Sequence, residues 1–320
     1  MKQIILGKTN QSVSSVSLGT WSFGGTNVSG TTPVGWANQS DEDSIEALIG
    51  AYESGINHWD TADVYGSGKS ENIIGSMWKN IPRNEIFLAT KVGWDKGEHK
   101  HWYNQEHMQQ QMNSSLKRLK TDCVDLLYLH HCNFGKNDAY FDGAIETVRR
   151  FQSEGKTKFI GLSDWDSHKI VKLIERCSPD VVQPYRNIWD DSYESSGLRL
   201  CAEKNNIGVC FFSPIMHGLL TGKYSKPTIF EKGDFRKNID AFKNQTIINK
   251  MRKNADSLKK RFNSHPYPVM HGIIDALIFD SKNSCALLGQ RNAAQVHIAK
   301  TLGIFMNEED VSWVKSIYEH

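Results

Sequence analysis

Three polar side chains in the sequence follow directly on apolar stretches, at positions where strands would end. Asp60 ends the run INHWD, Lys91 ends IFLATK, and His130 ends VDLLYLH. Tyr65 comes five residues after Asp60, in a turn that the following glycine indicates. The carboxyl ends of neighbouring parallel strands lie together, so these four groups would meet there. A carboxylate, a phenol, an ammonium and an imidazole in one place form an acid–base site.

The chemistry that suits this set is proton donation to an oxygen on which negative charge builds up. A phenol has a pKa of about 10, so it is a poor donor at pH 7 without help. Lys91 would lower the pKa of Tyr65, and Asp60 would hold Lys91 charged. His130 would orient the substrate oxygen. A carbonyl that receives hydride requires such a donor. Because no metal-ligand set is apparent, we expect no metal and an organic hydride cofactor.

Each residue has a simpler interpretation when it is considered alone. Asp60 would cap a turn, Lys91 would form a salt bridge, His130 would be a core histidine and Tyr65 would pack against its neighbours. Only their coincidence at the ends of strands two, three and four favours catalysis. Asp63, between Asp60 and Tyr65, is interpreted as a turn or capping residue.

The elements that must position these groups alternate regularly along the chain. Apolar runs that predict strands lie at 15–21, 56–60, 86–92, 124–130, 158–163, 181–185, 207–213 and 284–289. Patterns that predict helices lie at 43–54, 70–79, 106–117, 141–153, 167–176, 195–204 and about 246–261, with two more from 292 and at about 307–318. Apolar strands that alternate with helices predict parallel β-structure.

Two α/β folds fit this alternation. The length of 320 residues, with about forty residues in each unit, matches a closed (β/α)8 TIM barrel. An open doubly wound sheet is the alternative, but Gly19-Thr20-Trp21 lacks the glycine fingerprint that it normally carries. We expect a single domain over residues 1–320. Insertions at about 23–40, 94–104 and 221–245 follow strands, which predicts long βα loops at the C-terminal face.

The composition excludes several function classes. A formal net charge of +2 gives no basic footprint for nucleic acid or for a membrane surface. The N-terminal segment has no signal-peptide pattern, and no apolar run is long enough to span a membrane. The six cysteines contain no C-x-x-C pair, and several lie in apolar runs. Buried free thiols are favoured over a disulfide framework, so a cytoplasmic protein is expected.

A second group of residues is typical of phosphate binding. In barrels, phosphate sites form from the loops after strands seven and eight together with a helix N-terminus. Here these loops are 213–218 and 289–292, and their glycines permit close backbone approach. Asn292 is placed to cap the next helix. Arg291 could clamp a 2′-phosphate bidentately, which favours NADPH over NADH.

Two further cations lie in the long loop after the seventh strand. Lys223 and Arg236 could close over a pyrophosphate. The alternative is a solvated loop charge, and for Arg236 it is at least as good an interpretation.

These motifs resemble the signature of the aldo-keto reductases. The similarity includes DTADVYG, LATKVG and DLLYLH, and it continues in the same order and spacing through GLS, VVQPYRN, FFSPIMHGLLTGKY and LLGQRNAAQV. It covers the chain from about residue 6 to residue 303. The loops and the last two motifs are more similar to the bacterial and potassium-channel-β-like branches than to the mammalian aldose reductases.

The resemblance implies an NADPH-dependent reductase of aldehyde, ketone or sugar carbonyls. Tyr65 would be the proton donor, tuned by Lys91 and Asp60, and His130 would orient the carbonyl. The alternative from another class is a cofactor-sensing regulatory subunit with slow reductase activity. A reductase of nucleotide-linked keto-sugars is a third possibility. The sequence does not indicate the substrate, the preferred direction or the oligomeric state.

The resemblance also implies which residues hold the cofactor. Ser163 and Gln183 match the residues that bind the nicotinamide carboxamide, and Phe212 replaces a tyrosine that stacks on the ring. Asp164 stands where the family commonly has Asn, and Ala299 where it often has an adenine-binding Asn; Asp164 is still expected near the nicotinamide. The expected NADP(H)-binding residues are Gly19, Thr20, Trp21, Asp60, Ser163, Asp164, Gln183, Phe212, Ser213, Pro214, Ile215, Gly218, Leu220, Lys223, Arg236, Gly289, Arg291, Asn292 and Gln295.

The substrate is expected to be a small carbonyl compound in an apolar pocket above the nicotinamide. Trp21, Trp94 and Trp102 would line this pocket beside Tyr65 and His130, with core packing as the alternative for the tryptophans. The histidines in the run 98–101 lack identifiable further ligands, so we interpret that run as a solvated loop and expect no metal site there.

Overall fold

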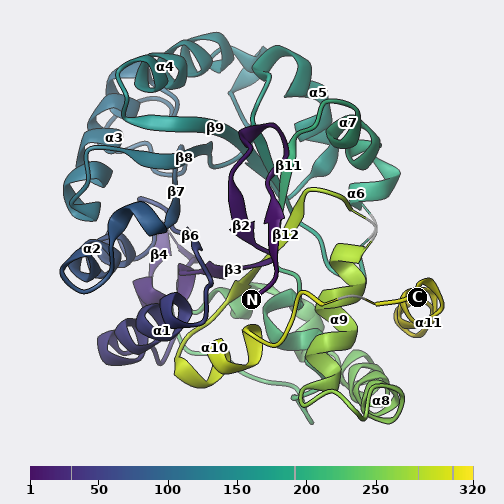
Figure 1. Ribbon diagram of the computed structural model, residues 1–320. Coiled ribbons are helices and arrows are strands. Elements are labelled where there is room, and N and C mark those ends of the chain that lie inside the picture. The colour runs from purple at the N-terminus through teal and green to yellow at the C-terminus, as the bar shows by residue number, and fades with distance from the viewer. Residues whose placement is uncertain (30, 191, 280, 305, 320) are drawn as a thin grey trace.

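The computed structural model describes residues 1–29, 31–190, 192–279, 281–304 and 306–319. Its centre is a closed barrel of parallel strands in the circular order β10-β11-β12-β3-β6-β7-β8-β9, ringed by helices (Figure 1). The barrel strands are β3 (Val16–Gly19), β6 (His58–Asp60), β7 (Phe87–Val92), β8 (Val124–Leu129), β9 (Thr157–Asp164), β10 (Val181–Pro184), β11 (Gly208–Phe212) and β12 (Ser284–Gly289). The predicted (β/α)8 fold is confirmed, with each strand inside or within one residue of its predicted range.

The helices also follow the predicted order, with ends that shift by a few residues. They are α1 (Asp41–Glu53), α2 (Lys69–Ser76), α3 (Gln105–Leu119), α4 (Phe141–Ser153), α5 (Ser167–Cys177), α6 (Ser192–Ser195), α7 (Leu198–Lys204), α8 (Gln245–Arg261), α9 (Pro268–Phe279), α10 (Ala293–Ala299) and α11 (Glu308–Tyr318). Side-chain caps begin some of them: the Ser40 side chain accepts from the Asp43 N–H at the start of α1.

Helix α9 was not predicted, for a physical reason. Its sequence PVMHGIIDALIF is buried over seven consecutive residues, from His271 to Leu277. A helix that is buried on all sides shows no amphipathic period, so the pattern cannot reveal it. It packs against both β12 and α8. Among the described residues, none of the helices has the length and apolarity required to cross a lipid bilayer.

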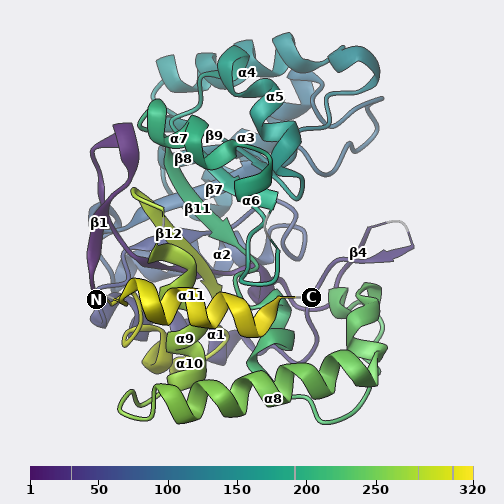
Figure 2. The same ribbon diagram turned by 90° about the vertical axis from the view of Figure 1, so that its right-hand side faces the viewer.

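The N-terminal end of the barrel is covered by a hairpin that the sequence pattern also did not indicate. Strands β1 (Gln3–Ile5) and β2 (Ser12–Ser14) pair in antiparallel fashion. Leu6 and Val13 are fully buried and pack on the residues inside the barrel. In Figure 2 this hairpin lies at the opposite end of the molecule from β4 (Val28–Ser29).

The C-terminal face carries the three predicted insertions. Residue 30, in the first of them, lies outside the described residues. The first insertion forms the small hairpin of β4 and β5 (Thr32–Pro33). It is tied to the third insertion, because the N–H of Ala37 donates to Asp234 at 3.0 Å and the Phe235 N–H donates to Gly35 O at 2.8 Å. The long loops therefore support one another above the barrel mouth.

Candidate active site

The strand ends bring Asp60 and Lys91 together inside the barrel mouth. Asp60 lies opposite Ala89 in the pairing of β6 with β7, so Lys91 is two residues further along and projects to the same side. Both side chains are 1% exposed, and the Lys91 ammonium donates to Asp60 Oδ1. It also donates to Thr61 O at 2.8 Å and to the Tyr65 hydroxyl at 3.3 Å. The ammonium thus links the carboxylate to the phenol.

Two further strands fix the second oxygen of Asp60. Gln183, on β10, donates from Nε2 to Asp60 Oδ2 at 2.8 Å. The Ser163 hydroxyl, at the end of β9, donates to Gln183 Oε1 at 3.5 Å. Asp60 is therefore held from both sides, and the carboxylate has little freedom to turn away from Lys91.

Burial changes the expected electrostatics of this group. Burial raises the pKa of Tyr65; Lys91 lowers it and Asp60 raises it again, so it lies above the usual value. The sequence-based expectation of a lowered pKa accounted for Lys91 but not for burial. Burial lowers the pKa of Lys91, but Asp60 and Tyr65 outweigh this effect, and the result is a raised pKa. At neutral pH the site holds a protonated phenol beside a charged ammonium.

His130 completes the set as a neutral imidazole. Burial, then Lys91 and His131, hold the pKa of His130 well below its ordinary value. Its ring meets the Tyr65 ring edge-on, with centroids 6.0 Å apart. Nδ1 has no hydrogen-bond partner within the described residues. A neutral histidine carries one N–H donor, so it can orient a substrate oxygen without competing as an acid.

These side chains open into a cavity of about 780 Å³, a size typical of small-molecule and cofactor sites. Most of the predicted residues line it: Gly19, Thr20, Trp21, Asp60, Tyr65, Lys91, Trp94, His130, Ser163, Gln183, Phe212, Ser213, Pro214, Ile215, Gly218, Lys223, Arg236, Gly289, Arg291 and Gln295. Trp21 stacks on Tyr65, with ring centroids 6.0 Å apart, and Trp94 lies 5.4 Å from His130. The reacting groups are therefore walled by aromatic rings.

Two predicted residues turn away from the cavity because their polar atoms are used elsewhere. Asp164 accepts from the backbone N–H of Cys132 at 2.6 Å and from that of Asp166 at 2.8 Å. Trp102 donates from its indole to Asn133 O at 3.0 Å. Asp164 thus anchors the loop after β8, and Trp102 anchors its own loop rather than the substrate pocket.

Two more residues that were expected to bind the cofactor do not line the cavity and have roles in the fold. Leu220 is fully buried in a cluster with α8 and α11 and does not line the cavity. Asn292 caps α10, since its side chain accepts from the Gln295 N–H at 3.1 Å. The capping role matches the sequence, while the Asn292 side chain does not line the cavity.

The far end of the cavity is cationic. Lys223, Arg236 and Arg291 line it, and the Asp234 carboxylate pairs with Arg236 at 2.6 Å. Burial, then Arg236 and Arg291, lower the pKa of Lys223. Gly218 has φ +92°, and a Cβ at that position would lie 2.9 Å from the Lys223 ammonium. The positive φ favours glycine at this position, and the absence of a side chain leaves room for the Lys223 ammonium beside the backbone.

Four aromatic residues of the cavity were not predicted. Trp36, Trp165, His217 and Phe235 all line it. Trp165 comes directly after the end of β9, so its position alone could have indicated it. Trp36 and Phe235 lie in insertions and His217 lies in the loop 213–218, where the sequence carries no period from which side-chain direction can be inferred.

Asp63 is the other residue that the sequence pattern did not identify. Asp63 lies in a turn, as expected, but it does not cap α2, whose N-cap is Gly68. Neither carboxylate oxygen has a hydrogen-bond partner in the described part of the chain, and the side chain lines the cavity at 5% exposure. Burial, then Glu71, raise the pKa of Asp63 well above its ordinary value of 3.8, with Arg118 acting against them. Asp63 is thus an unpaired acid just behind the catalytic groups.

Asp63→Asn is expected to stabilise the protein increasingly as the pH rises. The unfolded chain ionises Asp63 near its ordinary pKa, while the folded chain keeps the proton up to the raised pKa. Between these values the folded state binds more protons, so wild-type stability falls with pH by about 1.4 kcal/mol per unit from this group. Urea unfolding of both proteins from pH 4 upward measures the difference. The exposed Asp122→Asn is the control, and a difference independent of pH would contradict the assignment.

Comparisons with known proteins agree with the geometry. The sequence model of the Aldo/keto reductase family matches residues 15–319. The aldo-keto reductase YhdN of Bacillus subtilis is 27% identical over 330 aligned positions, which cover 100% of this chain and 94% of that protein. An NADH-specific methylglyoxal reductase of Escherichia coli is 30% identical over 264 positions, which cover 78% and 77%.

A solved structure supports the same relationship. The glycerol dehydrogenase of Gluconobacter oxydans superposes with a TM-score of 0.81 at 26% sequence identity, covering 98% of this chain and 94% of that one. The family match begins at the first barrel strand and continues through α11. The chain therefore belongs to the aldo/keto reductase family.

Proposed function

We propose that the chain is an NADPH-dependent carbonyl reductase that acts on small aldehydes, ketones or sugars. The observation that carries the proposal is the Tyr65 hydroxyl, bonded to the buried Lys91 ammonium at 3.3 Å and facing His130 across the cavity. A phenol in that position can donate a proton to a substrate oxygen in the cavity.

The side chains divide the work in a way that follows from their contacts. His130 orients the substrate carbonyl oxygen toward Tyr65, and Tyr65 gives its proton to that oxygen as charge builds on it. Lys91 stabilises the phenolate that remains, and Asp60 keeps Lys91 in place and charged. The nicotinamide, when bound, supplies the hydride that the carbonyl carbon accepts.

The cavity fits such a cofactor at both ends. Near Asp60, Ser163 and Gln183 present a hydroxyl and an amide for a carboxamide, and Phe212 adds an aromatic plane. At the far end, Lys223, Arg236 and Arg291 line the cavity, a gathering of positive charge that suits phosphate groups. Two phosphate-binding loops and an aromatic-walled mouth in one cavity support a phosphorylated dinucleotide.

Steady-state oxidation of NADPH against a panel of aldehydes, ketones, sugars and nucleotide-linked keto-sugars tests the proposal. A reductase should turn over at least one of these classes at a rate typical of enzymes, on the order of 1 s⁻¹ or more. A protein that binds NADPH tightly in a parallel titration but turns over none of them would instead be a cofactor-sensing regulatory subunit. That outcome would overturn the proposal.

Arg291→Ala is expected to weaken NADPH binding about 10- to 100-fold and NADH binding far less, because a charged hydrogen bond to a 2′-phosphate would be lost. Arg291 donates to Gln39 Oε1 at 2.9 Å and to Ala37 O at 2.6 Å, so its guanidinium is held in a fixed position. Fluorescence titration with both cofactors provides the measurement. Gln39→Ala is the control for loss of that anchoring alone, and equal losses for NADPH and NADH in Arg291→Ala would exclude the 2′-phosphate role.

We also propose a cytoplasmic location. All six cysteines lie within the described residues, and none forms a disulfide. Unpaired thiols are typical of reducing compartments. Cell fractionation with an antibody to the protein tests this directly.

A further inference from the structure

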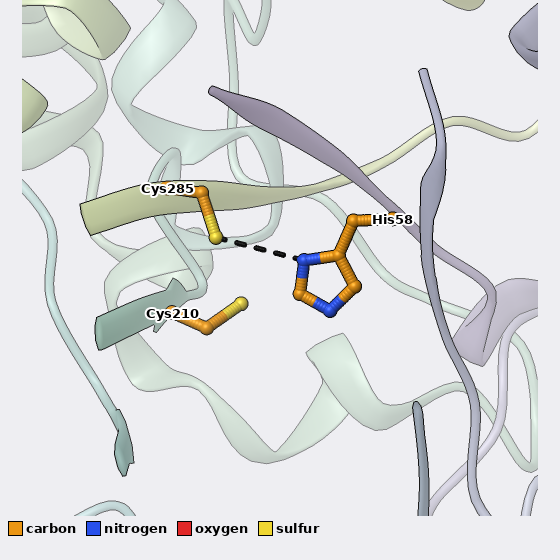
Figure 3. Close-up of side chains that lie close together, drawn as sticks. All are labelled: His58, Cys210 and Cys285. Carbon is orange, nitrogen blue, oxygen red and sulfur yellow. Dashed lines mark hydrogen bonds between the residues drawn. The ribbon is translucent and has the colours of Figure 1, made fainter. Parts of the chain in front are cut away.

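A cluster of sulfur and nitrogen donors lies inside the barrel beneath the catalytic groups. It consists of His58 on β6, Cys210 on β11 and Cys285 on β12, each of them fully buried (Figure 3). His58 comes two residues before Asp60 on the same strand, so both side chains project into the barrel and His58 lies one layer deeper. The proposed carbonyl chemistry uses none of the three.

The three side chains converge on one point. Figure 3 shows both sulfur atoms directed toward the imidazole. Cys210 and Cys285 are opposite each other in the pairing of β11 with β12. The possible ligand atoms all lie within 4.8 Å of one another, and Cys285 Sγ is 3.7 Å from His58 Nδ1. Ser17, on the neighbouring strand β3, places its hydroxyl 2.8 Å from the same nitrogen.

This spacing is close to that of ligands around a zinc ion. Zn–S bonds of about 2.3 Å and Zn–N bonds of about 2.0 Å in a tetrahedron separate the ligand atoms by roughly 3.5–3.8 Å. The pair Cys285 Sγ and His58 Nδ1 already has this separation. The remaining ligand atoms would have to move by about 1 Å or less, which side-chain rotation can provide.

We propose that His58 Nδ1, Cys210 Sγ and Cys285 Sγ form a binding site for a thiophilic cation, with Zn²⁺ as the ion and the Ser17 hydroxyl as the fourth donor. Two thiolates and an imidazole are the ligands of zinc and other soft metals. Mg²⁺ and Ca²⁺ require mainly oxygen donors, and the cluster offers a single hydroxyl.

The balance of charge fits a fully buried position. Binding of Zn²⁺ replaces the protons of two thiols, which leave as two H⁺, while the imidazole binds through its neutral form. Two neutral thiols become two thiolates around a divalent ion, so the net charge of the barrel interior does not change. An uncompensated charge at this depth would be strongly unfavourable.

Packing is the competing explanation, because buried cysteines often serve as small apolar residues. It accounts for the two thiols but less well for His58, a fully buried polar side chain that directs Nδ1 toward Cys285 Sγ and the Ser17 hydroxyl. A purely apolar layer would be more stable with an apolar side chain there. The inference is independent of the proposed reductase function, since a metal in this layer would connect β3, β6, β11 and β12 without contacting substrate.

Metal content of the full-length protein tests the site. Protein produced in zinc-supplemented medium and dialysed against a weak chelator is expected to retain about one Zn²⁺ per chain by mass spectrometry. Cys210→Ser and Cys285→Ser should lose most of this zinc, while Cys177→Ser, which removes a buried thiol outside the cluster, should keep it. The proposal is overturned if the wild-type protein retains no zinc. It is also overturned if the two cluster variants retain as much zinc as the wild type.

A second measurement needs no variant and therefore stands even if a serine variant fails to fold. X-ray absorption at the zinc edge of the wild-type protein should show two sulfur ligands and one or two nitrogen or oxygen ligands. A zinc shell of oxygen and nitrogen only would place the ion elsewhere and exclude the cluster. Carbonyl reductase activity is measured in parallel, so failure of the zinc site and failure of the proposed function are distinguishable.

Discussion

Replacement of Tyr65 by Phe is expected to lower the turnover number about 10²- to 10⁴-fold while NADPH still binds. The hydroxyl is the proton donor in the proposed reaction, and Phe removes it without changing the ring that stacks on Trp21. Burial raises the pKa of Tyr65, so the wild-type phenol stays protonated at neutral pH. His130 cannot replace it, because the pKa of His130 lies well below its ordinary value.

The measurement is single-turnover and steady-state oxidation of NADPH with the best carbonyl substrate, together with a cofactor titration. Tyr193→Phe is the matched control: Tyr193 is fully buried and its hydroxyl bonds to Ser281 at 3.1 Å, outside the cavity. It should keep its activity. A Tyr65→Phe enzyme with wild-type turnover would show that Tyr65 is not the acid.

The positions of the candidate catalytic residues could be predicted because they depend on the strands. The barrel strands are apolar and short, so their ends are visible in the sequence, and Asp60, Lys91 and His130 stand at those ends. In a parallel barrel, the end of a strand is also the mouth of the site. The short apolar strands in the sequence therefore predicted both the fold and the positions of the candidate catalytic residues.

The residues that could not be predicted lie where that pattern stops. Asp164 stands at a strand end, but its carboxylate is taken up by two backbone N–H groups that the chain brings together only on folding. Asp63 resembles a turn residue in sequence, and only the folded chain shows that it is buried near Glu71 and Arg118. The raised pKa of Tyr65 has the same origin, since the sequence identifies the neighbouring charges but not the loss of water.

Lys91→Met is expected to abolish most activity and also to destabilise the protein by about 3–5 kcal/mol. Lys91 and Asp60 are each 1% exposed, so removal of the ammonium leaves a buried carboxylate without its counter-charge. The matched control is Lys158→Met. Lys158 is 58% exposed and pairs with Asp125, which Arg83 also binds, so its loss should cost about 1 kcal/mol or less.

The double variant Asp60→Asn with Lys91→Met separates stability from catalysis. Asn is neutral and can still accept the hydrogen bond that Gln183 donates to Asp60 at 2.8 Å, so most of the lost stability should return. Activity should not return, because neither new side chain can stabilise the Tyr65 phenolate. Urea unfolding and NADPH oxidation measure the two quantities on the same preparations. If the double variant is as unstable as Lys91→Met, the unpaired carboxylate is not the cause of the destabilisation. If its turnover is restored, the ion pair contributes to the stability of the fold and is not required for proton donation by Tyr65.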